Sequence, residues 1–86
     1  MFAHQITPIA LVAIKHEEWN TLDYLIDQLS GWMESYDKDT ADAASEIGMA
    51  LQDKVKETNN HDIKFQRIIH SLYTYALSTY KELNNA

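Results

Sequence analysis

The chain of 86 residues has no cysteine, one proline and two glycines. The absence of cysteine excludes a disulfide framework, a thiol nucleophile and a thiolate metal site. Basic residues are also scarce, because seven Lys and Arg stand against thirteen Asp and Glu, for a formal net charge of −6. This imbalance argues against direct binding of nucleic acid, which needs an excess of cations facing phosphate. The hydrophobic share of 45% is typical of a globular protein, and the length allows one domain over residues 1–86.

Long hydrophobic runs are missing as well. The uninterrupted apolar stretch Ile9–Ile14 is short, whereas a transmembrane helix needs roughly 20 apolar residues. No Lys or Arg precedes this stretch, so it does not fit a secretory signal peptide either. We therefore expect a cytoplasmic protein with no membrane partner.

Two polar clusters, Asp37–Thr40 and Thr58–Asp62, interrupt an otherwise helical periodicity and predict turns. No run of alternating β-branched residues predicts a strand. Short turns between long helices place successive helices side by side in opposite directions. The expected fold class is all-α: a small antiparallel bundle of three long helices, or four if the first breaks near residues 19–21.

The first predicted piece has apolar residues at the spacing of a helical seam: Trp19, Leu22, Ile26, Leu29, Met33 and Tyr36. Thr7 is a candidate N-cap, with Pro8 at the first helical position. Asn20 is a second candidate cap, so the piece is either one helix over residues 8–36 or two helices that meet near residues 19–21. Gly31 lies inside the pattern, and we expect it to allow the close approach of a neighbouring helix.

The second predicted helix begins at Asp39 or Thr40 and runs to about Thr58, and the third begins near Asp62. Several small residues in the second helix favour close packing against its neighbours. The predicted central core combines the apolar faces of all three pieces: Leu22, Ile26, Leu29, Ile47, Leu51, Phe65, Ile69, Leu72 and Ala76.

The apolar stretch near the N-terminus has two interpretations. A first helix over residues 8–36 would be about 43 Å long against about 29 Å for residues 40–58, so its N-terminal turns would lack support. These turns either fold back as a fourth helix or pair with another copy of the chain. In the second case the self-association residues would be Ile9, Leu11, Val12 and Ile14, and the chain would form a homodimer.

Negative charge is concentrated between Glu17 and Glu46, where nine acids accompany one base. In the second predicted helix, Asp42, Glu46, Asp53 and Glu57 are 4, 7 and 4 residues apart and share one face. This face is either only solvated or complementary to a basic partner. A protein that binds nucleic acid is the natural candidate, because it presents Lys and Arg spaced for anions.

Tyrosines supply the candidate anchors of such a contact, since exposed Tyr offers a large area at little entropy cost. The alternative is that their rings lie over the edge of the bundle with the hydroxyls in water. The predicted partner-binding residues are seven acids and four tyrosines: Glu34, Asp37, Asp39, Asp42, Glu46, Asp53, Glu57, Tyr24, Tyr73, Tyr75 and Tyr80.

No catalytic motif is found. The four histidines form no HExxH pair and no i, i+4 metal face, and there is no glycine-rich phosphate loop. We expect no cofactor and no metal, and we expect a non-enzymatic protein that inhibits or masks a larger basic partner. In size and acidity the chain is similar in type to the small inhibitors of phages and mobile elements, anti-CRISPR proteins among them, and to bacteriocin immunity proteins. The alternative function is a self-associating helical adaptor or structural subunit.

Overall fold

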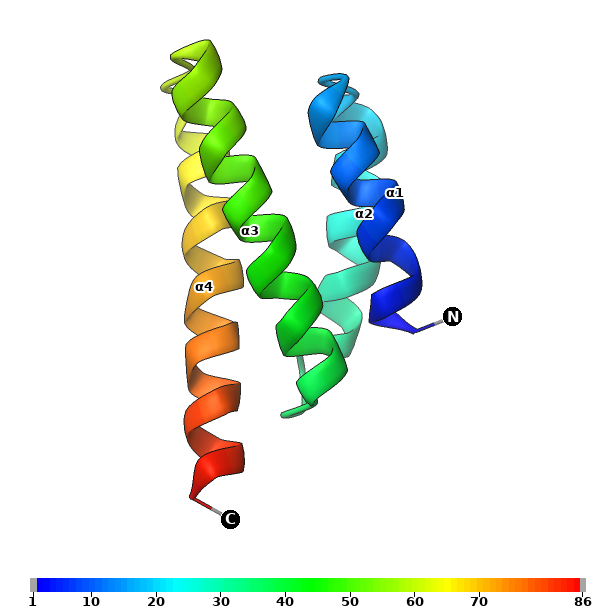
Figure 1. The fold of residues 1–86 in the computed structure, drawn as a ribbon, viewed down its shortest axis with the longest axis vertical. Coiled ribbons are helices and arrows are strands. Elements are labelled where there is room, and N and C mark those ends of the chain that lie inside the picture. The colour runs from blue at the N-terminus through cyan, green and yellow to red at the C-terminus, as the bar shows by residue number, and fades with distance from the viewer. Residues whose placement is uncertain (1, 86) are drawn as a thin grey trace.

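A computed structural model describes residues 2–85 and shows an all-α antiparallel bundle, with no strand in that range (Figure 1). The predicted fold class is confirmed, and the chain adopts the four-helix form. The helices are α1 (Ala3–Lys15), α2 (Trp19–Trp32), α3 (Lys38–Thr58) and α4 (Ile63–Asn84).

Helix α3 is the central element of the bundle. It packs along α4 on one side and along α1 on the other, and α2 packs mainly against α1. The backbones of α2 and α4 stay apart, with no pair of Cα atoms within 8 Å, and the two helices meet through long side chains such as Trp19 and Phe65, whose ring centroids are 4.7 Å apart. The last turns of α4 extend beyond the end of the other helices (Figure 1).

The break between α1 and α2 lies at residues 16–18, slightly before the predicted position near residues 19–21. Glu17 has a left-handed backbone with φ of 55°, and the N–H of Glu18 donates to the carbonyl of Ala13 at 2.8 Å. Glu18 occupies the N-cap position of α2, so Asn20 is not the cap. The apolar stretch Ile9–Ile14 therefore folds back within its own chain, and the mismatch in helix length disappears.

Helix α1 begins at Ala3, so the prediction of Thr7 as N-cap and Pro8 as the first helical residue is wrong. Thr7 is buried, and its Oγ1 donates to the carbonyl of Ala3 at 3.2 Å. Pro8 lies exposed inside the helix. There its missing N–H removes one hydrogen bond, the one to the carbonyl of His4.

Two side chains stabilise the early start of α1 by accepting from N–H groups that have no partner within the helix. Oε1 of Gln5 accepts from the N–H of Phe2 at 2.6 Å. Oδ2 of Asp39 accepts from the N–H of His4 at 3.2 Å. Asp39 is 35 residues from His4 in the chain, so no local sequence pattern reveals this cap.

The two predicted turns have different outcomes. The turn before α4 is confirmed, with Asp62 as N-cap accepting from the N–H of Lys64 at 3.0 Å. The earlier turn lies at residues 33–37 rather than 37–40, because α2 already ends at Trp32. Asp37 caps α3 by accepting from the N–H of Thr40 at 3.0 Å.

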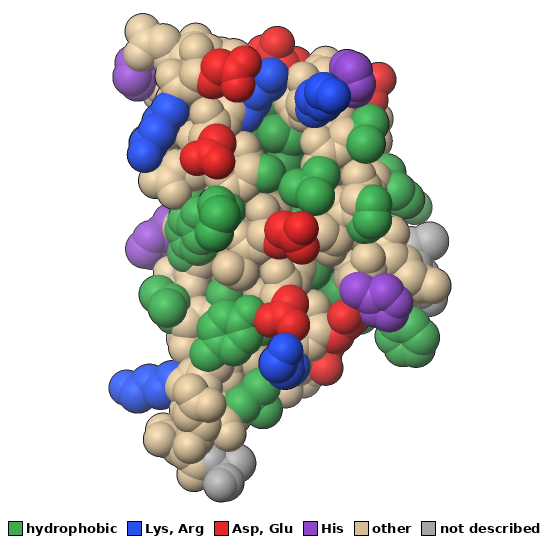
Figure 2. Space-filling view, in the orientation of Figure 1, with side chains coloured by type: hydrophobic (Ala, Val, Ile, Leu, Met, Phe, Trp, Pro, Cys, Tyr) green, Lys and Arg blue, Asp and Glu red, His purple; other side chains and the backbone are tan. Residues whose placement is uncertain are grey.

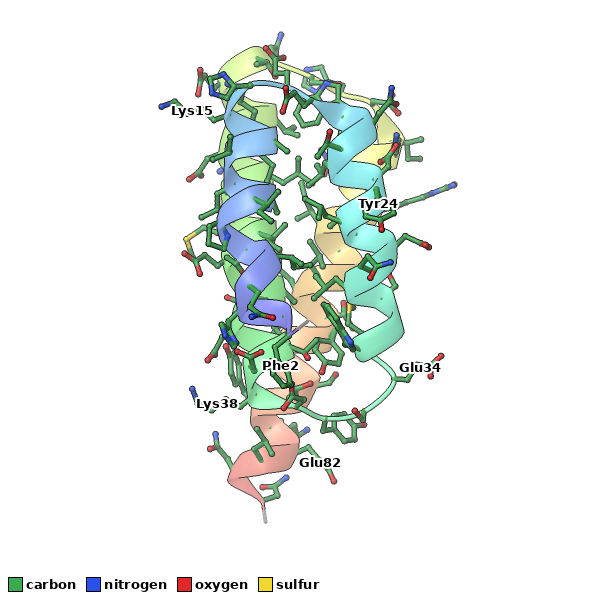
Figure 3. The ribbon with its side chains drawn as sticks, turned by 90° about the vertical axis from the view of Figure 1, so that its right-hand side faces the viewer. Phe2, Lys15, Tyr24, Glu34, Lys38 and Glu82 are labelled. Atoms are coloured by element: carbon green, nitrogen blue, oxygen red, sulfur yellow. The ribbon has the colours of Figure 1, made fainter. Side chains whose placement is uncertain are left out.

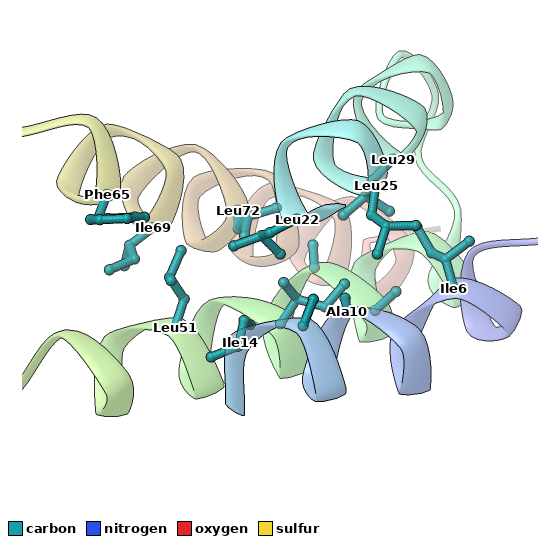
Figure 4. Close-up of a cluster of buried hydrophobic side chains, with 14 of the residues drawn as sticks. Ile6, Ala10, Ile14, Leu22, Leu25, Leu29, Leu51, Phe65, Ile69 and Leu72 are labelled. Carbon is teal, nitrogen blue, oxygen red and sulfur yellow. The ribbon is translucent and has the colours of Figure 1, made fainter. Parts of the chain in front are cut away.

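Eight of the nine predicted central core residues are buried, and the exception is Ile26, which is half-buried. Ile26 lies on the side of α2 that faces α4, where the two backbones stay apart, so its outer side remains uncovered. Helix α1 adds a further set of buried residues that the predicted core did not include: Ala3, Ile6, Ala10, Ala13 and Ile14. Figure 4 shows side chains from all four helices meeting in this core.

The predictions that involve the two glycines have different outcomes, because the close packing expected of the small residues in the second helix is confirmed at Gly48. A Cβ atom on Gly48 would lie 3.4 Å from Cβ of Leu72 and 3.4 Å from the ring of Tyr73, so this glycine allows α3 and α4 to pack closely. A Cβ atom on Gly31 would meet nothing within 4 Å. The prediction of a helix close to Gly31 is therefore wrong.

We predict that Leu51→Ala and Leu72→Ala each lower the free energy of unfolding by about 2–5 kcal/mol, because each leaves a cavity in addition to the lost transfer energy. Both side chains are fully buried. Chemical denaturation followed by circular dichroism measures the change. The control is Leu77→Ala, since Leu77 is exposed on α4 and its truncation is expected to cost less than about 0.5 kcal/mol. Equal effects at Leu77 and Leu51 would contradict the assignment of the core.

Candidate functional site

The structure places Asp42, Glu46, Asp53 and Glu57 on the exposed side of α3. Figure 2 shows acidic side chains along the middle of this face, with hydrophobic side chains over α1 beside them. We call these four acids the α3 acidic row. Their placement follows from packing, because the other sides of α3 are occupied by α1 and α4.

A groove runs beside the α3 acidic row, between α1 and α3. It consists of two open cavities of about 300 and 270 Å³ that share Leu11. The first is lined by Asp42 and Glu46, and the second by Asp53 and Glu57. The α1–α3 groove thus has an apolar residue at its centre and all four acids along one wall.

Part of the negative charge is already paired within the chain. Asp42 accepts from Nζ of Lys38 at 2.9 Å and from the hydroxyl of Tyr80. Glu57 lies 3.7 Å from Nζ of Lys54. The carboxylates of Asp42 and Glu57 stay exposed in these contacts, and surface ion pairs contribute only about 0–1 kcal/mol.

Glu46 and Asp53 differ from their neighbours in the row. Neither makes a hydrogen bond or an ion pair with another residue in the described part of the chain. Their carboxylates are exposed and fully available to a partner, so they are the two positions that best report on the function of the row.

Asp42 and Tyr80 change each other's ionisation. The hydrogen bond from Tyr80, followed by the one from Lys38, lowers the pKa of Asp42 below its ordinary value. The same bond to Asp42, helped by burial, raises the pKa of Tyr80 to about 12. The bond to Asp42 also raises the pKa of Lys38. Tyr80 therefore holds Asp42 against α4 in its ionised form.

The remaining predicted acids lie at the end of the bundle where α3 begins. Glu34 is exposed on the loop after α2. Asp37 caps α3, and Asp39 contacts the ring of His4 at 3.1 Å between Oδ1 and Nδ1. Together, Glu34, Asp37 and Asp39 line one cavity.

Three of the four predicted tyrosine anchors use their hydroxyls inside the fold. Tyr73 donates to Oε1 of Gln52 at 3.1 Å, and Tyr80 donates to Asp42. Tyr75 donates to the carbonyl of Ser35 at 2.7 Å, and so attaches the loop before α3 to α4. Their rings are half-buried, as the alternative supposed, and each hydroxyl also donates to another residue of the chain.

Tyr24 is different, because 65% of its surface is exposed on the outer side of α2. It lies away from the α3 acidic row (Figure 3). The structure therefore does not bring Tyr24 together with the predicted acids.

The predicted self-association residues are also divided by the structure. Ile9 and Val12 are exposed, with 48% and 54% of their surfaces accessible. Leu11 is half-buried in the α1–α3 groove. Ile14 is buried in the core, so it is corrected from an interface residue to a core residue.

We predict that Tyr80→Phe raises the pKa of Asp42 toward its ordinary value, because the substitution removes the hydrogen bond that lowers it most. Carbon-detected NMR titration of the Asp42 carboxyl measures this shift. The exposed residue Tyr24 provides a control in Tyr24→Phe, which should leave the pKa of Asp42 unchanged.

The same pair predicts how stability depends on pH. Ionised Asp42 stabilises the fold above pH 3.8, and this contribution is lost as pH falls through its lowered pKa. Neutral Tyr80 stabilises the fold below pH 10, and this contribution is lost as pH rises from 10 to about 12. Wild type should therefore lose more stability than Tyr80→Phe between pH 9 and pH 12 in urea denaturation. Parallel losses in the two proteins would contradict the coupling.

Within residues 2–85, no group of three or more His, Asp or Glu is arranged to hold a metal ion. None of the described helices combines the length and the apolar character needed to cross a membrane. No protein-family model, curated protein or solved structure matches this chain.

Proposed function

We propose that this chain is a non-catalytic acidic binding protein that inhibits or masks a larger, basic, nucleic-acid-handling protein. The observation that carries the proposal is the α3 acidic row beside a groove, with Glu46 and Asp53 free of partners among the described residues. Exposed charges of one sign attract an oppositely charged surface and raise the rate of association.

The dimensions of the row suit such a partner. From Asp42 to Glu57 the row covers about 22 Å of helix axis, at 1.5 Å per residue. One strand of B-DNA carries about six phosphates over that length. A Lys and Arg surface shaped for nucleic acid is therefore of the right size to meet the row, and occupying that surface would exclude the nucleic acid.

The proposal places the chain among inhibitors of phage, mobile-element or immunity-protein type, acting in the cytoplasm. It rests on small size, acidity and a surface charge pattern. It also treats the chain as a binding protein rather than an enzyme. The rigid attachment of α3 to two neighbouring helices supports this, because a preorganised surface loses little entropy on binding.

We predict that Glu46→Lys combined with Asp53→Lys slows association with the partner by about tenfold or more, because it reverses the two unpaired charges of the row. These positions are preferred to Asp42, whose reversal would also break its bonds to Lys38 and Tyr80. Capture from a host lysate with wild-type bait identifies the partner, and binding kinetics at two salt concentrations then measure the effect.

The control carries the same change of charge away from the row, as Asp27→Lys on α2 combined with Glu82→Lys on α4. Both positions are exposed, and the control should bind nearly as fast as wild type. Circular dichroism should be the same for all three proteins. Binding that is indifferent both to salt and to reversal at Glu46 and Asp53 would refute the proposal.

A second candidate function is supported by the exposure of Ile9 and Val12 on the outer side of α1. Exposed apolar side chains on one helix face are typical of a surface that another molecule covers. Here the chain would be a self-associating adaptor or structural subunit, with a homodimer as its simplest form.

We predict under this alternative that Ile9→Glu combined with Val12→Glu halves the mass in sedimentation equilibrium and leaves helicity unchanged, because neither side chain belongs to the core. Substitution of Ile14 would be uninformative, since it is buried. The control is Leu77→Glu, at an exposed apolar position on α4. A wild-type protein that remains a monomer at high concentration rules the alternative out.

A further inference from the structure

A cavity of about 520 Å³ lies at the end of the bundle where α1 begins and α2 ends. We call it the end pocket. Its walls combine three aromatic side chains with three carboxylates: Phe2, Trp32, Tyr36, Glu34, Asp37 and Asp39. Figure 3 shows Phe2 between the ends of α1 and α2, and Glu34 on the loop at the rim.

The aromatic rings of the end pocket are unusually open to solvent. Phe2 is 68% exposed and Tyr36 is 56% exposed, whereas Trp32 is half-buried against the core. Tyr36 lies on the loop after α2 rather than on its apolar face, because the helix already ends at Trp32. Gly31 adds space to the same wall, since a Cβ atom there would meet nothing within 4 Å. The ring of Phe2 stacks on His4, with ring centroids 5.9 Å apart, so the pocket offers the other face of Phe2 together with the exposed ring of Tyr36.

The charge of the end pocket is of one sign. Among residues 2–85, no Lys or Arg lines it. Asp37 accepts from Thr40 as the cap of α3 and Asp39 accepts from His4, whereas Glu34 is exposed and has no such partner among the described residues. Anions are repelled by this lining, and a purely apolar ligand would leave carboxylates desolvated without a partner.

We propose that the end pocket binds an arginine side chain carried by a basic segment of the partner. This inference rests on the proposed function and names the group that such a partner would present. A guanidinium stacks on aromatic faces, is weakly hydrated and donates to carboxylates in pairs. The aromatic rings of the cavity fit the stacking, and the carboxylate of Glu34, which has no partner among the described residues, fits the donation. The volume of 520 Å³ also leaves room for backbone on either side of the arginine.

The test uses NMR titration of the full chain, labelled with ¹⁵N, against a blocked pentapeptide of sequence Gly-Ser-Arg-Ser-Gly. The control peptide carries citrulline, which has nearly the shape of arginine without its charge. We expect shift changes at Gly31, Glu34, Tyr36 and the indole N–H of Trp32. The citrulline peptide should bind at least about fivefold more weakly.

Single substitutions test which residues of the end pocket contribute to binding of the arginine peptide. Phe2→Ala and Tyr36→Ala should each weaken binding of the arginine peptide by about two- to fivefold, the range of a single exposed cation–π contact. Glu34→Gln should weaken binding and reduce its dependence on salt. Tyr24→Ala is the matched control, because Tyr24 is about as exposed as Phe2 but lies outside the pocket, and it should change nothing.

Three results would overturn the inference. Equal binding of the citrulline peptide would remove the role of charge, and tighter binding of tetramethylammonium would assign the pocket to free organic cations. Self-association that is lost in Phe2→Ala would assign it to a second copy of the chain.

The proposal for the end pocket and the proposal for the α3 acidic row can be refuted separately. Peptide binding that is lost with Phe2 and Tyr36, beside partner binding indifferent to Glu46 and Asp53, supports the pocket and refutes the row. The reverse pattern refutes the pocket and retains the proposed function.

Discussion

The close packing of α3 against both α1 and α4 is the constraint on which the remaining structure depends. Small residues make it possible: Ala43 and Ala44 are buried, and Gly48 lets α4 approach to contact distance. Because α1 and α4 cover two sides of α3, its charged residues lie on the remaining side, which faces solvent. The α3 acidic row is thus a product of packing, whatever it binds, and its carboxylates are held on a rigid support.

Long-range hydrogen bonds at the lower end of the bundle then determine the second surface. Asp39 accepts from the backbone and the ring of His4, which fixes the start of α1. Tyr75 bonds to Ser35 and accepts from the N–H of Asp37, which fixes the loop after α2. These contacts bring Phe2 and Tyr36, 34 residues apart in the sequence, to the same cavity.

Features that depend on the local sequence pattern were predicted correctly. Features that depend on contacts between distant residues were not. Helical periodicity identified the fold class and eight buried residues of α2, α3 and α4, but not those of α1. The polar cluster Thr58–Asp62 marked the turn before α4. Thr7 and Pro8 satisfied the local rules for a helix start, yet Asp39 allowed α1 to begin earlier. Tyr36 fitted the seam of α2 by spacing, but the helix ends before it. The spacing of the four acids predicted the α3 acidic row. The end pocket was not predicted, because no local pattern relates Phe2 to the residues after Gly31 that line the same cavity.

Asp39 lines both the α1–α3 groove and the end pocket, so the two surfaces adjoin there. A basic segment lying along the groove would pass the α3 acidic row and reach the aromatic rings at its end. The two parts would contribute differently to such a complex. Exposed acids act at a distance and mainly set the rate of association, and salt screens them over about 8–10 Å. A side chain enclosed by aromatic rings must leave its contacts before the complex separates, so it mainly sets the rate of dissociation. An inhibitor needs both properties, because it must reach its target before nucleic acid does and then remain bound.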